Sequence, residues 1–139
     1  MRAPMLALLT AIAAVALAPR SAPAFDNQQF CVAARELLRA AAGDIGTWTD
    51  RFTRNDGVDI GCELKTVNFK RFYNSKSMPD EAWMAKQAAI WESGYCSRTL
   101  WREAIANGWV VSATVTTAAG PRVWLACLPN GRGFYRALP

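Results

Sequence analysis

The 139-residue sequence contains no histidine, which is the commonest general base and the commonest metal ligand in proteins. It also contains no dinucleotide-binding fingerprint, phosphate-binding loop, nucleophile elbow or cluster of metal ligands. A C-x-x-C pair, the usual arrangement of catalytic thiols, is missing as well. These absences predict a protein that is not an enzyme and that uses no cofactor and no metal. A hydrolase working through carboxylates such as Asp50, Asp59 and Glu63 is a less favoured alternative.

Long hydrophobic runs are lacking too, since none reaches the roughly 18 to 20 residues that cross a bilayer. An apolar run over residues 5–18 follows Arg2 and precedes the small residues "SAPA", which end at Ala24. This pattern predicts a cleaved signal peptide over residues 1–24. We therefore expect a single exported domain over residues 25–139, periplasmic or secreted, without a transmembrane segment.

The chain has little excess of charge of one sign. Without Arg2 and Arg20 of the predicted signal peptide, 14 basic residues remain beside 11 acidic ones, a net charge of +3. Nucleic-acid-binding proteins usually carry a larger and more clustered basic excess. We therefore expect no nucleic acid partner.

Four cysteines in an exported chain are typical of two disulfides, which they can form in three ways. A lipid anchor is disfavoured, because the first cysteine, Cys31, does not stand at the predicted cleavage point. The separation between Cys31 and Cys62 along the chain equals that between Cys96 and Cys127. Shifting the sequence by 65 positions therefore aligns Cys31 with Cys96 and Cys62 with Cys127. This spacing predicts an internal repeat in which the cysteines are structural crosslinks.

The first repeat unit opens with a predicted helix. Asp26 is the expected N-cap, Gln29 completes a capping box, and Phe25 contacts Phe30 in a hydrophobic staple. Gly43 is the expected left-handed C-terminal cap. The predicted buried stripe of this helix consists of Phe30, Ala34, Leu37, Leu38 and Ala41.

A hairpin is predicted to follow, with its turn at residues 55–57, "NDG", because Asn and Gly tolerate positive φ. Its strands are expected over residues 47–53 and 58–65. Alternation in the second strand points Val58, Ile60, Cys62 and Leu64 to one side. A cysteine on the inner face of the sheet can meet one in the first turn of the helix above it, which predicts the pair Cys31–Cys62.

The second unit repeats these signals. Its helix is expected to follow Cys96, with Ser97 as N-cap, and to end at Asn107–Gly108 after a buried stripe. The expected strands are "WVVSATVTT" and "RVWLACL", joined by "AAGP". The second of these strands points Cys127 inward, which predicts the pair Cys96–Cys127.

Together these signals predict an α+β fold: an antiparallel sheet of four or five strands with helices packed on it. Two helix–hairpin units, residues 25–74 and 95–139, build it, and "GFYRAL" is a candidate edge strand. An extra helix over residues 77–94, starting at Ser77, has no counterpart in the first unit. In element order this layout resembles small exported cystatin-like domains, in which a helix packs across an antiparallel sheet. The likeness concerns element order and implies no function.

One predicted strand is apolar on both sides, since Trp124, Ala126 and Leu128 lie opposite Cys127. Such a sheet needs cover on both faces or exposes a patch that attracts a partner. The favoured interpretation is that the extra helix covers or flanks this region, and a recognition face containing Trp124 is the alternative.

Basic and aromatic residues alternate in "KTVNFKRFYNSK", residues 65–76, and again in "GRGFYRAL", residues 131–138. Such a run is usually a solvated strand end and loop, but it can also bind anions through charge and stacking. The candidate binding residues in the two segments are Lys70, Arg71, Tyr73, Arg132, Tyr135 and Arg136.

These expectations favour a non-catalytic binding or accessory protein of the bacterial envelope. Its partner is expected to be an envelope or secreted protein that contacts an apolar and aromatic face. Binding of an anionic polymer or lipid is an alternative, and a homodimer through the apolar sheet face is a further hypothesis.

Overall fold

The computed structural model describes residues 24–76 and 79–139. The predicted signal peptide and Ser77 therefore lie outside the described residues, apart from Ala24. The three helices are α1 (Asn27–Ala40), α2 (Glu81–Trp91) and α3 (Thr99–Ala106). The five strands are β1 (Thr53–Gly61), β2 (Thr66–Tyr73), β3 (Val110–Thr117), β4 (Arg122–Cys127) and β5 (Gly133–Leu138).

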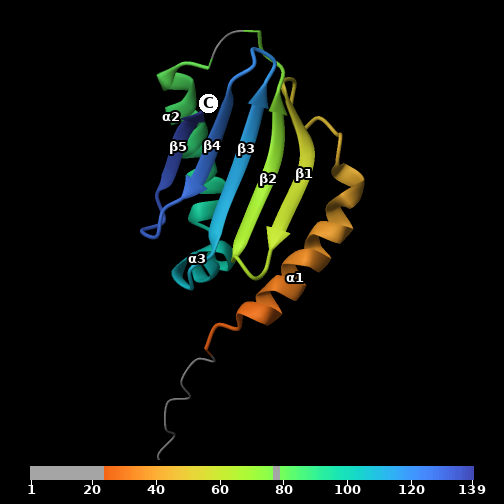
Figure 1. Cartoon of the computed structure of the whole chain (residues 1–139), viewed down its shortest axis with the longest axis vertical. Coiled ribbons are helices and arrows are strands. Elements are labelled where there is room, and N and C mark those ends of the chain that lie inside the picture. Colours follow the sequence, from red (N-terminus) through yellow and green to blue (C-terminus); the bar gives the residue numbers. More distant parts are fainter. Residues whose placement is uncertain (1–23, 77–78) are drawn as a thin grey trace, which may run out of the picture.

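The strands form one sheet in the order β1-β2-β3-β4-β5 (Figure 1). The pairs β1/β2, β3/β4 and β4/β5 are antiparallel, as predicted, and "GFYRAL" forms the edge strand β5. The β2/β3 pair is parallel, so the expectation of a wholly antiparallel sheet is wrong at this pair. The reason is the crossover through α2 and α3, which returns the chain to the end of the sheet where β2 began. The sheet is therefore mixed, unlike the sheet in the cystatin-like layout.

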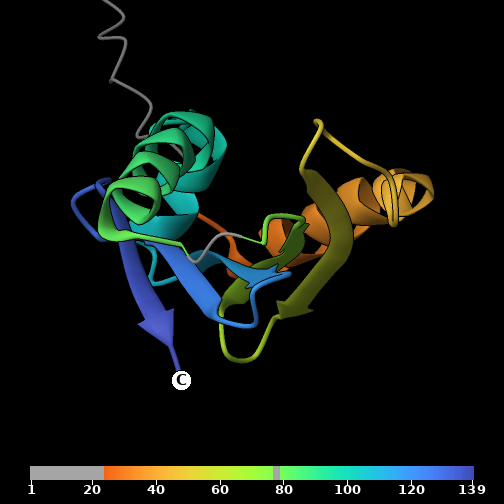
Figure 2. The ribbon, with the colours of Figure 1, turned by 90° about the horizontal axis from the view of Figure 1, so that it is seen from above.

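The helices lie on one side of the sheet (Figure 2). Phe30 of α1 contacts Trp101 of α3 and Trp109, with ring centroids 6.1 and 4.7 Å apart. Trp91 of α2 contacts Phe69 of β2 at 5.8 Å. These aromatic contacts join all three helices and the middle of the sheet in one core. Of the six tryptophans, Trp91, Trp101 and Trp109 are buried.

The start of α1 agrees with the prediction. The Asp26 carboxylate accepts hydrogen bonds from the backbone N–H groups of Gln28 and Gln29, both at 2.9 Å. The rings of Phe25 and Phe30 lie 5.5 Å apart, as a hydrophobic staple requires.

The predicted end of α1 at Gly43 is wrong. The helix ends at Ala40 and tightens into a 3-10 turn over Ala41–Asp44, and the positive φ of 85° belongs to Gly46. The N–H of Ala41 bonds to carbonyls of the last helical turn, so no left-handed residue is needed there. Leu37 is 55% exposed, so the predicted buried stripe does not hold at this position, whereas Phe30 and Ala34 are buried.

The predicted turn at residues 55–57 is also wrong, since these residues form a β-bulge inside β1. Asn55 pairs with Arg71 and Gly57 with Lys70, which leaves Asp56 as the extra residue. Gly57 does adopt a positive φ, 114°, but it serves the bulge.

The true turn of this hairpin follows Cys62, and the basic and aromatic run becomes the inner strand β2 instead of a loop. The predicted strand at 47–53 is reduced to a single bridge, Trp48–Arg54. After Trp48 the chain forms a loop in which the Asp50 carboxylate accepts hydrogen bonds from the N–H groups of Phe52 and Thr53. Few residues of this segment are therefore left to pair as a strand.

The second half corrects one helix start and confirms one helix end. Ser97 is not the N-cap of α3, because Arg98 holds that place and the Ser97 hydroxyl donates to the Glu92 carbonyl at 2.9 Å. Gly108, with φ 88°, follows the end of α3 as predicted. The extra helix is α2, with Asp80 as N-cap, and it runs into a wide π-type turn over Glu92–Cys96.

Both predicted disulfides are present. Cys31–Cys62 joins α1 to the end of β1, with Cα atoms 5.9 Å apart, and Cys96–Cys127 joins the turn before α3 to the end of β4, with Cα atoms 5.4 Å apart. At the offset that superposes the cysteine pairs, α1, β1 and β2 correspond to α3, β4 and β5. The internal repeat itself stays a prediction.

Candidate binding surface

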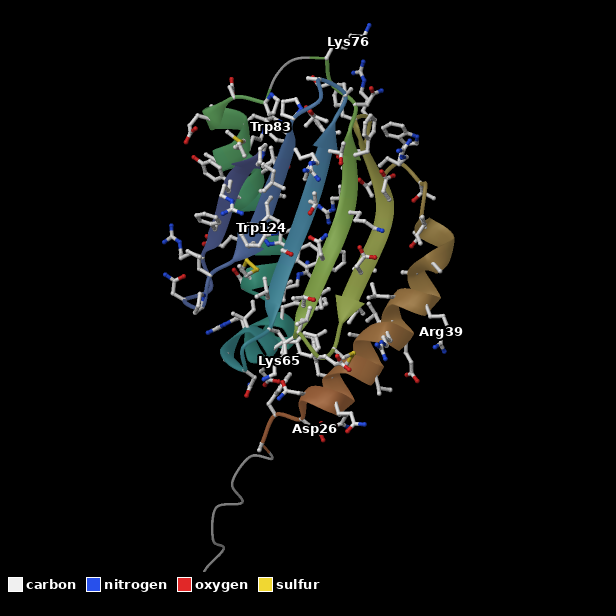
Figure 3. All side chains as sticks on the ribbon, viewed as in Figure 1. Asp26, Arg39, Lys65, Lys76, Trp83 and Trp124 are labelled. Carbon is white, nitrogen blue, oxygen red and sulfur yellow. A yellow bond between two sulfur atoms is a disulfide. The ribbon has the colours of Figure 1, made fainter. Side chains whose placement is uncertain are left out.

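The sheet face opposite the helices carries the side chains that alternate with the core residues of each strand. Val123 and Leu125 of β4 point into the core, so Trp124 between them points to the other side. We call this side the open face. Figure 1 shows it toward the viewer with α2 behind β4 and β5, and Figure 3 shows where Trp124 lies.

The helix α2 packs on the core side of β4 and β5. Its Trp91 contacts Phe69 in the core, and its Glu81 accepts a hydrogen bond from the hydroxyl of Tyr135 on the core side of β5. The helix α2 therefore packs on β4 and β5 from the core side, but the interpretation that it covers the face containing Trp124 is wrong. The pattern of α2 did not reveal this, because its large apolar residues lie on several sides of the helix.

The centre of the open face is a row of residues that crosses four strands. Lys70 of β2 pairs with Thr114, Thr114 with Trp124, and Trp124 with Arg136 of β5. The guanidinium carbon of Arg136 lies 5.6 Å from the Trp124 ring centroid, within the range of a cation–π contact. The Phe134 ring meets the edge of Trp124 at 6.2 Å and 74°.

Small residues form the floor beside Trp124. Ser112 and Ala126 are 4% and 3% exposed although they belong to the open face. Around them, the exposed apolar residues are Val110, Leu128 and Phe134. This part of the open face is therefore apolar, with the aromatic pair at its centre.

The β1–β2 side of the open face is polar. A shallow depression of about 420 Å³ lies over β2 and β3, and its lining includes Asn68, Lys70 and Arg122. Lys70 Nζ lies 3.3 Å from a carboxylate oxygen of Asp59, so its charge is paired. Arg136 has no carboxylate within 4.0 Å among the residues described. Arg122, which lines the depression, likewise has no Asp or Glu carboxylate within 4.0 Å among the described residues, so at both Arg122 and Arg136 the open face carries positive charge that no acidic side chain pairs.

The structure separates the candidate residues into two sets. Lys70, Trp124 and Arg136 share the open face, with Lys70 and Arg136 three strand spacings, about 14 Å, apart. The others lie elsewhere: Arg71, Tyr73 and Tyr135 on the core side, and Arg132 in the β4–β5 connection, 3.3 Å from Glu92. The two basic and aromatic segments therefore do not form one continuous basic track.

Tyr135 and Glu81 are coupled through their hydrogen bond. Because the phenol donates to the carboxylate, losing its proton would place two negative charges side by side. This contact raises the pKa of Tyr135 above its ordinary value, and burial adds to the effect. The Tyr135 hydroxyl therefore serves to fix α2 on β5.

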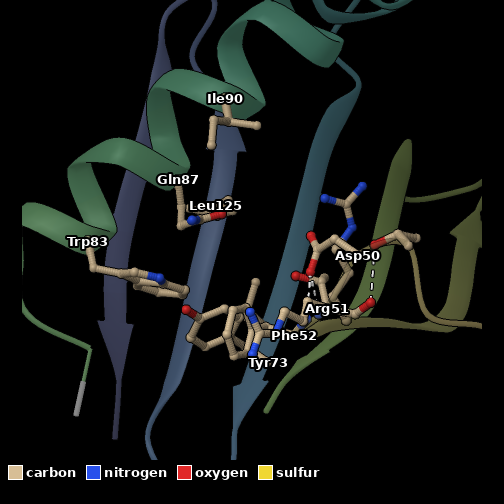
Figure 4. Close-up of a pocket in the computed structure, with 12 residues that line it drawn as sticks. Asp50, Arg51, Phe52, Tyr73, Trp83, Gln87, Ile90 and Leu125 are labelled. Atoms are coloured by element: carbon tan, nitrogen blue, oxygen red, sulfur yellow. Dashed lines mark hydrogen bonds between the residues drawn. The ribbon is translucent and has the colours of Figure 1, made fainter. Parts of the chain in front are cut away.

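Sequence analysis missed a second hollow, on the helix side of the sheet (Figure 4). It has a volume of about 290 Å³ and lies between α2 and the loop at residues 49–53, above β2, β3 and β4. We call it the α2 groove. Its lining comes from separate parts of the chain, and no local pattern joins them. Among the residues that sequence analysis named for a site, Asp50, Arg71 and Tyr73 line this groove, but it did not connect them.

In residues 24–76 and 79–139, no three His, Cys, Asp or Glu side chains are grouped so that they could hold a metal ion. Within the same ranges, no helix has the length and apolar character needed to span a membrane.

No family model and no curated protein sequence matches the chain. The fold is similar to the crystal structure of a Pseudomonas aeruginosa protein that is inferred to be secreted. The TM-score is 0.50, and the similarity covers 81% of this chain and 90% of that chain at 8% sequence identity. At this identity the comparison supports the fold alone.

Proposed function

We propose that the protein is an exported, non-catalytic accessory protein that binds another envelope or secreted protein through the open face. One observation carries the proposal: Trp124, Phe134 and Arg136 form a cluster on a sheet face that no described helix covers. Tryptophan and arginine are enriched among the residues that dominate protein–protein binding energy.

Export rests on three observations. Residues 1–24 have the pattern of a signal peptide, and the two disulfides fit an oxidising compartment. The protein with the similar fold is itself inferred to be secreted.

The size of the open face suits a protein partner. Five strands at about 4.8 Å spacing and about 26 Å length give a face of about 500 Å² in projection. This is comparable with one side of a small protein–protein interface. The exposed apolar side chains Val110, Leu128 and Phe134 would bury against such a partner, with the polar β1–β2 side as rim.

The geometry favours a protein over an anionic polymer or lipid. A polymer track needs unpaired cations in a continuous line, whereas Lys70 is paired with Asp59 and Arg132 with Glu92. The guanidinium of Arg71 lies on the opposite side of the sheet, near Trp91 and Tyr95. Arg136 lies within the aromatic cluster, where it can pair with a carboxylate at an interface.

Photocrosslinking at single positions tests the proposal. A photoreactive amino acid replaces Phe134 on the open face or Leu37, which is exposed on α1, in the exported protein. We expect one stoichiometric protein adduct from position 134 and none from position 37. Equal adducts from both positions, or no protein adduct from position 134, would contradict the proposal. An adduct between two copies of the chain would show that the partner is a second copy and that the open face forms a homodimer.

A further inference from the structure

The α2 groove has apolar walls that no described side chain fills. The rings of Trp83 and Tyr73 lie 4.8 Å apart on one side, and Phe52 contacts Tyr73 at 6.0 Å on the other. At the rim, Ile90 is 52% and Phe52 44% exposed, although both line the groove. Apolar side chains around a concave site are the usual lining of a small-ligand pocket.

A half-buried cation also lines the groove. Arg71 donates from Nη2 to the Tyr95 hydroxyl at 3.0 Å, and its guanidinium carbon lies 5.6 and 5.7 Å from the Trp91 and Tyr95 ring centroids. No carboxylate of the described residues lies within 4.0 Å of it. A guanidinium has five N–H donors, and Arg71 forms no ion pair, although the nearby charge of Asp50, whose pKa it helps to lower, offsets part of the cost of its partial burial. An anionic group in the groove would offset that cost.

The Asp50 carboxylate, which also lines the groove, forms its hydrogen bonds within its own loop. Asp50 Oδ1 accepts hydrogen bonds from the backbone N–H groups of Phe52 and Thr53, at 2.7 and 2.8 Å. Asp50 therefore holds the loop in place, and Arg71 keeps donors for a ligand. Its negative charge would still oppose a bound anion.

We propose that the α2 groove binds a carboxylate joined to a single apolar or aromatic ring. The carboxylate pairs with Arg71, and the ring packs against the sides of Trp83, Tyr73 and Phe52 that face the groove. A volume of about 290 Å³ lies at the lower end of ligand pockets, which suits one ring and not a larger ligand. This chemistry occurs both in small aromatic acids and in the C-terminal residue of a peptide. The site lies on the opposite side of the sheet from the open face, so it is independent of the proposed function.

Titration followed by NMR of the tryptophan indole N–H groups tests the proposal. The probes are phenylacetate, phenylethylamine, and the peptide acetyl-Gly-Gly-Phe with a free or amidated C-terminus. We expect phenylacetate or the free-acid peptide to shift the Trp83 signal saturably and to leave Trp124 unchanged. Binding of phenylacetate identifies a small-acid site, and binding of the peptide acid alone identifies a C-terminus site. No saturable shift with either acid, or equal binding of phenylethylamine or the peptide amide, overturns the proposal.

Three variants separate this site from a non-specific apolar contact. Ile90→Glu places a negative charge at the exposed rim, and we expect it to weaken binding of the acid about tenfold. Leu37→Glu adds the same charge on α1, outside the groove, and should leave the affinity unchanged. Asp50→Asn keeps an oxygen for the loop but removes the charge, and should tighten binding about threefold. Unchanged affinity in Ile90→Glu, or weaker binding in Asp50→Asn, overturns the proposal.

Discussion

Trp124 of β4 stands directly opposite Arg136 of β5, and the guanidinium of Arg136 lies over the face of the indole ring. Neither residue reaches the core. Their neighbours on the same strands, Leu125 and Tyr135, turn the other way and pack toward the helices. The sheet therefore has two different faces, one packed into the core and one that no described helix covers.

The two disulfides should each contribute strongly to stability. Each closes a loop spanning 31 positions, for which chain entropy predicts about 3 to 4 kcal/mol. Replacing Cys31 and Cys62 together by Ser, or Cys96 and Cys127 together by Ser, should lower the free energy of unfolding by about that amount. Urea denaturation of each variant measures the loss. Peptide mapping without reduction should join the Cys31 and Cys62 peptides, and a link from Cys31 to Cys127 would contradict the fold.

Gly133 is expected to tolerate no side chain. A Cβ atom there would overlap the backbone carbonyl oxygen of Ala88 and crowd Glu92 of the following turn, because α2 lies directly on β5. We expect Gly133→Ala to destabilise the protein by about 2 to 4 kcal/mol. The matched control is Gly43→Ala, where no atom lies within 4 Å and φ is not positive. Thermal unfolding of both variants checks the difference, and equal stability would show that α2 does not sit on β5 in this way.

Asp50 should make stability depend on acid pH. The N–H of Phe52 lowers the pKa of this carboxyl below its ordinary value of 3.8, although burial opposes the shift. A lowered pKa in the folded state stabilises the fold above the unfolded-state pKa, and this contribution is lost as the pH falls through the folded-state pKa. Asp50 is largely exposed, so the effect should be small. The free energy of unfolding between pH 6 and pH 2 should therefore fall less steeply in Asp50→Asn than in the wild type, and identical slopes would contradict the loop geometry.

Local signals predicted the parts of this fold that depend on neighbouring residues. Asp26 and Phe25 mark the start of α1 through contacts within one helical turn. The equal spacing of the cysteines, together with their predicted inner faces, indicated the correct pairing. Strand alternation also placed Val58 and Ile60 toward the core, although the turn was misplaced.

The errors arise where a distant partner decides between local alternatives. Gly57 does have a positive φ, but pairing with Lys70 of β2 makes it part of a bulge. The parallel β2/β3 pair depends on the route of the chain through α2 and α3, which strand patterns do not encode. The α2 groove likewise needs the loop at Asp50, strand β2 and helix α2 together.

The most direct test of the central claim measures the affinity of the crosslinked partner for two variants. Trp124→Ala removes the centre of the open face, and Leu37→Ala removes an exposed apolar side chain on α1. If the open face is the binding surface, Trp124→Ala should weaken binding at least about thirtyfold, corresponding to about 2 kcal/mol, while Leu37→Ala leaves it unchanged. Equal affinities for Trp124→Ala and the wild type, with the fold intact by circular dichroism, would contradict the account.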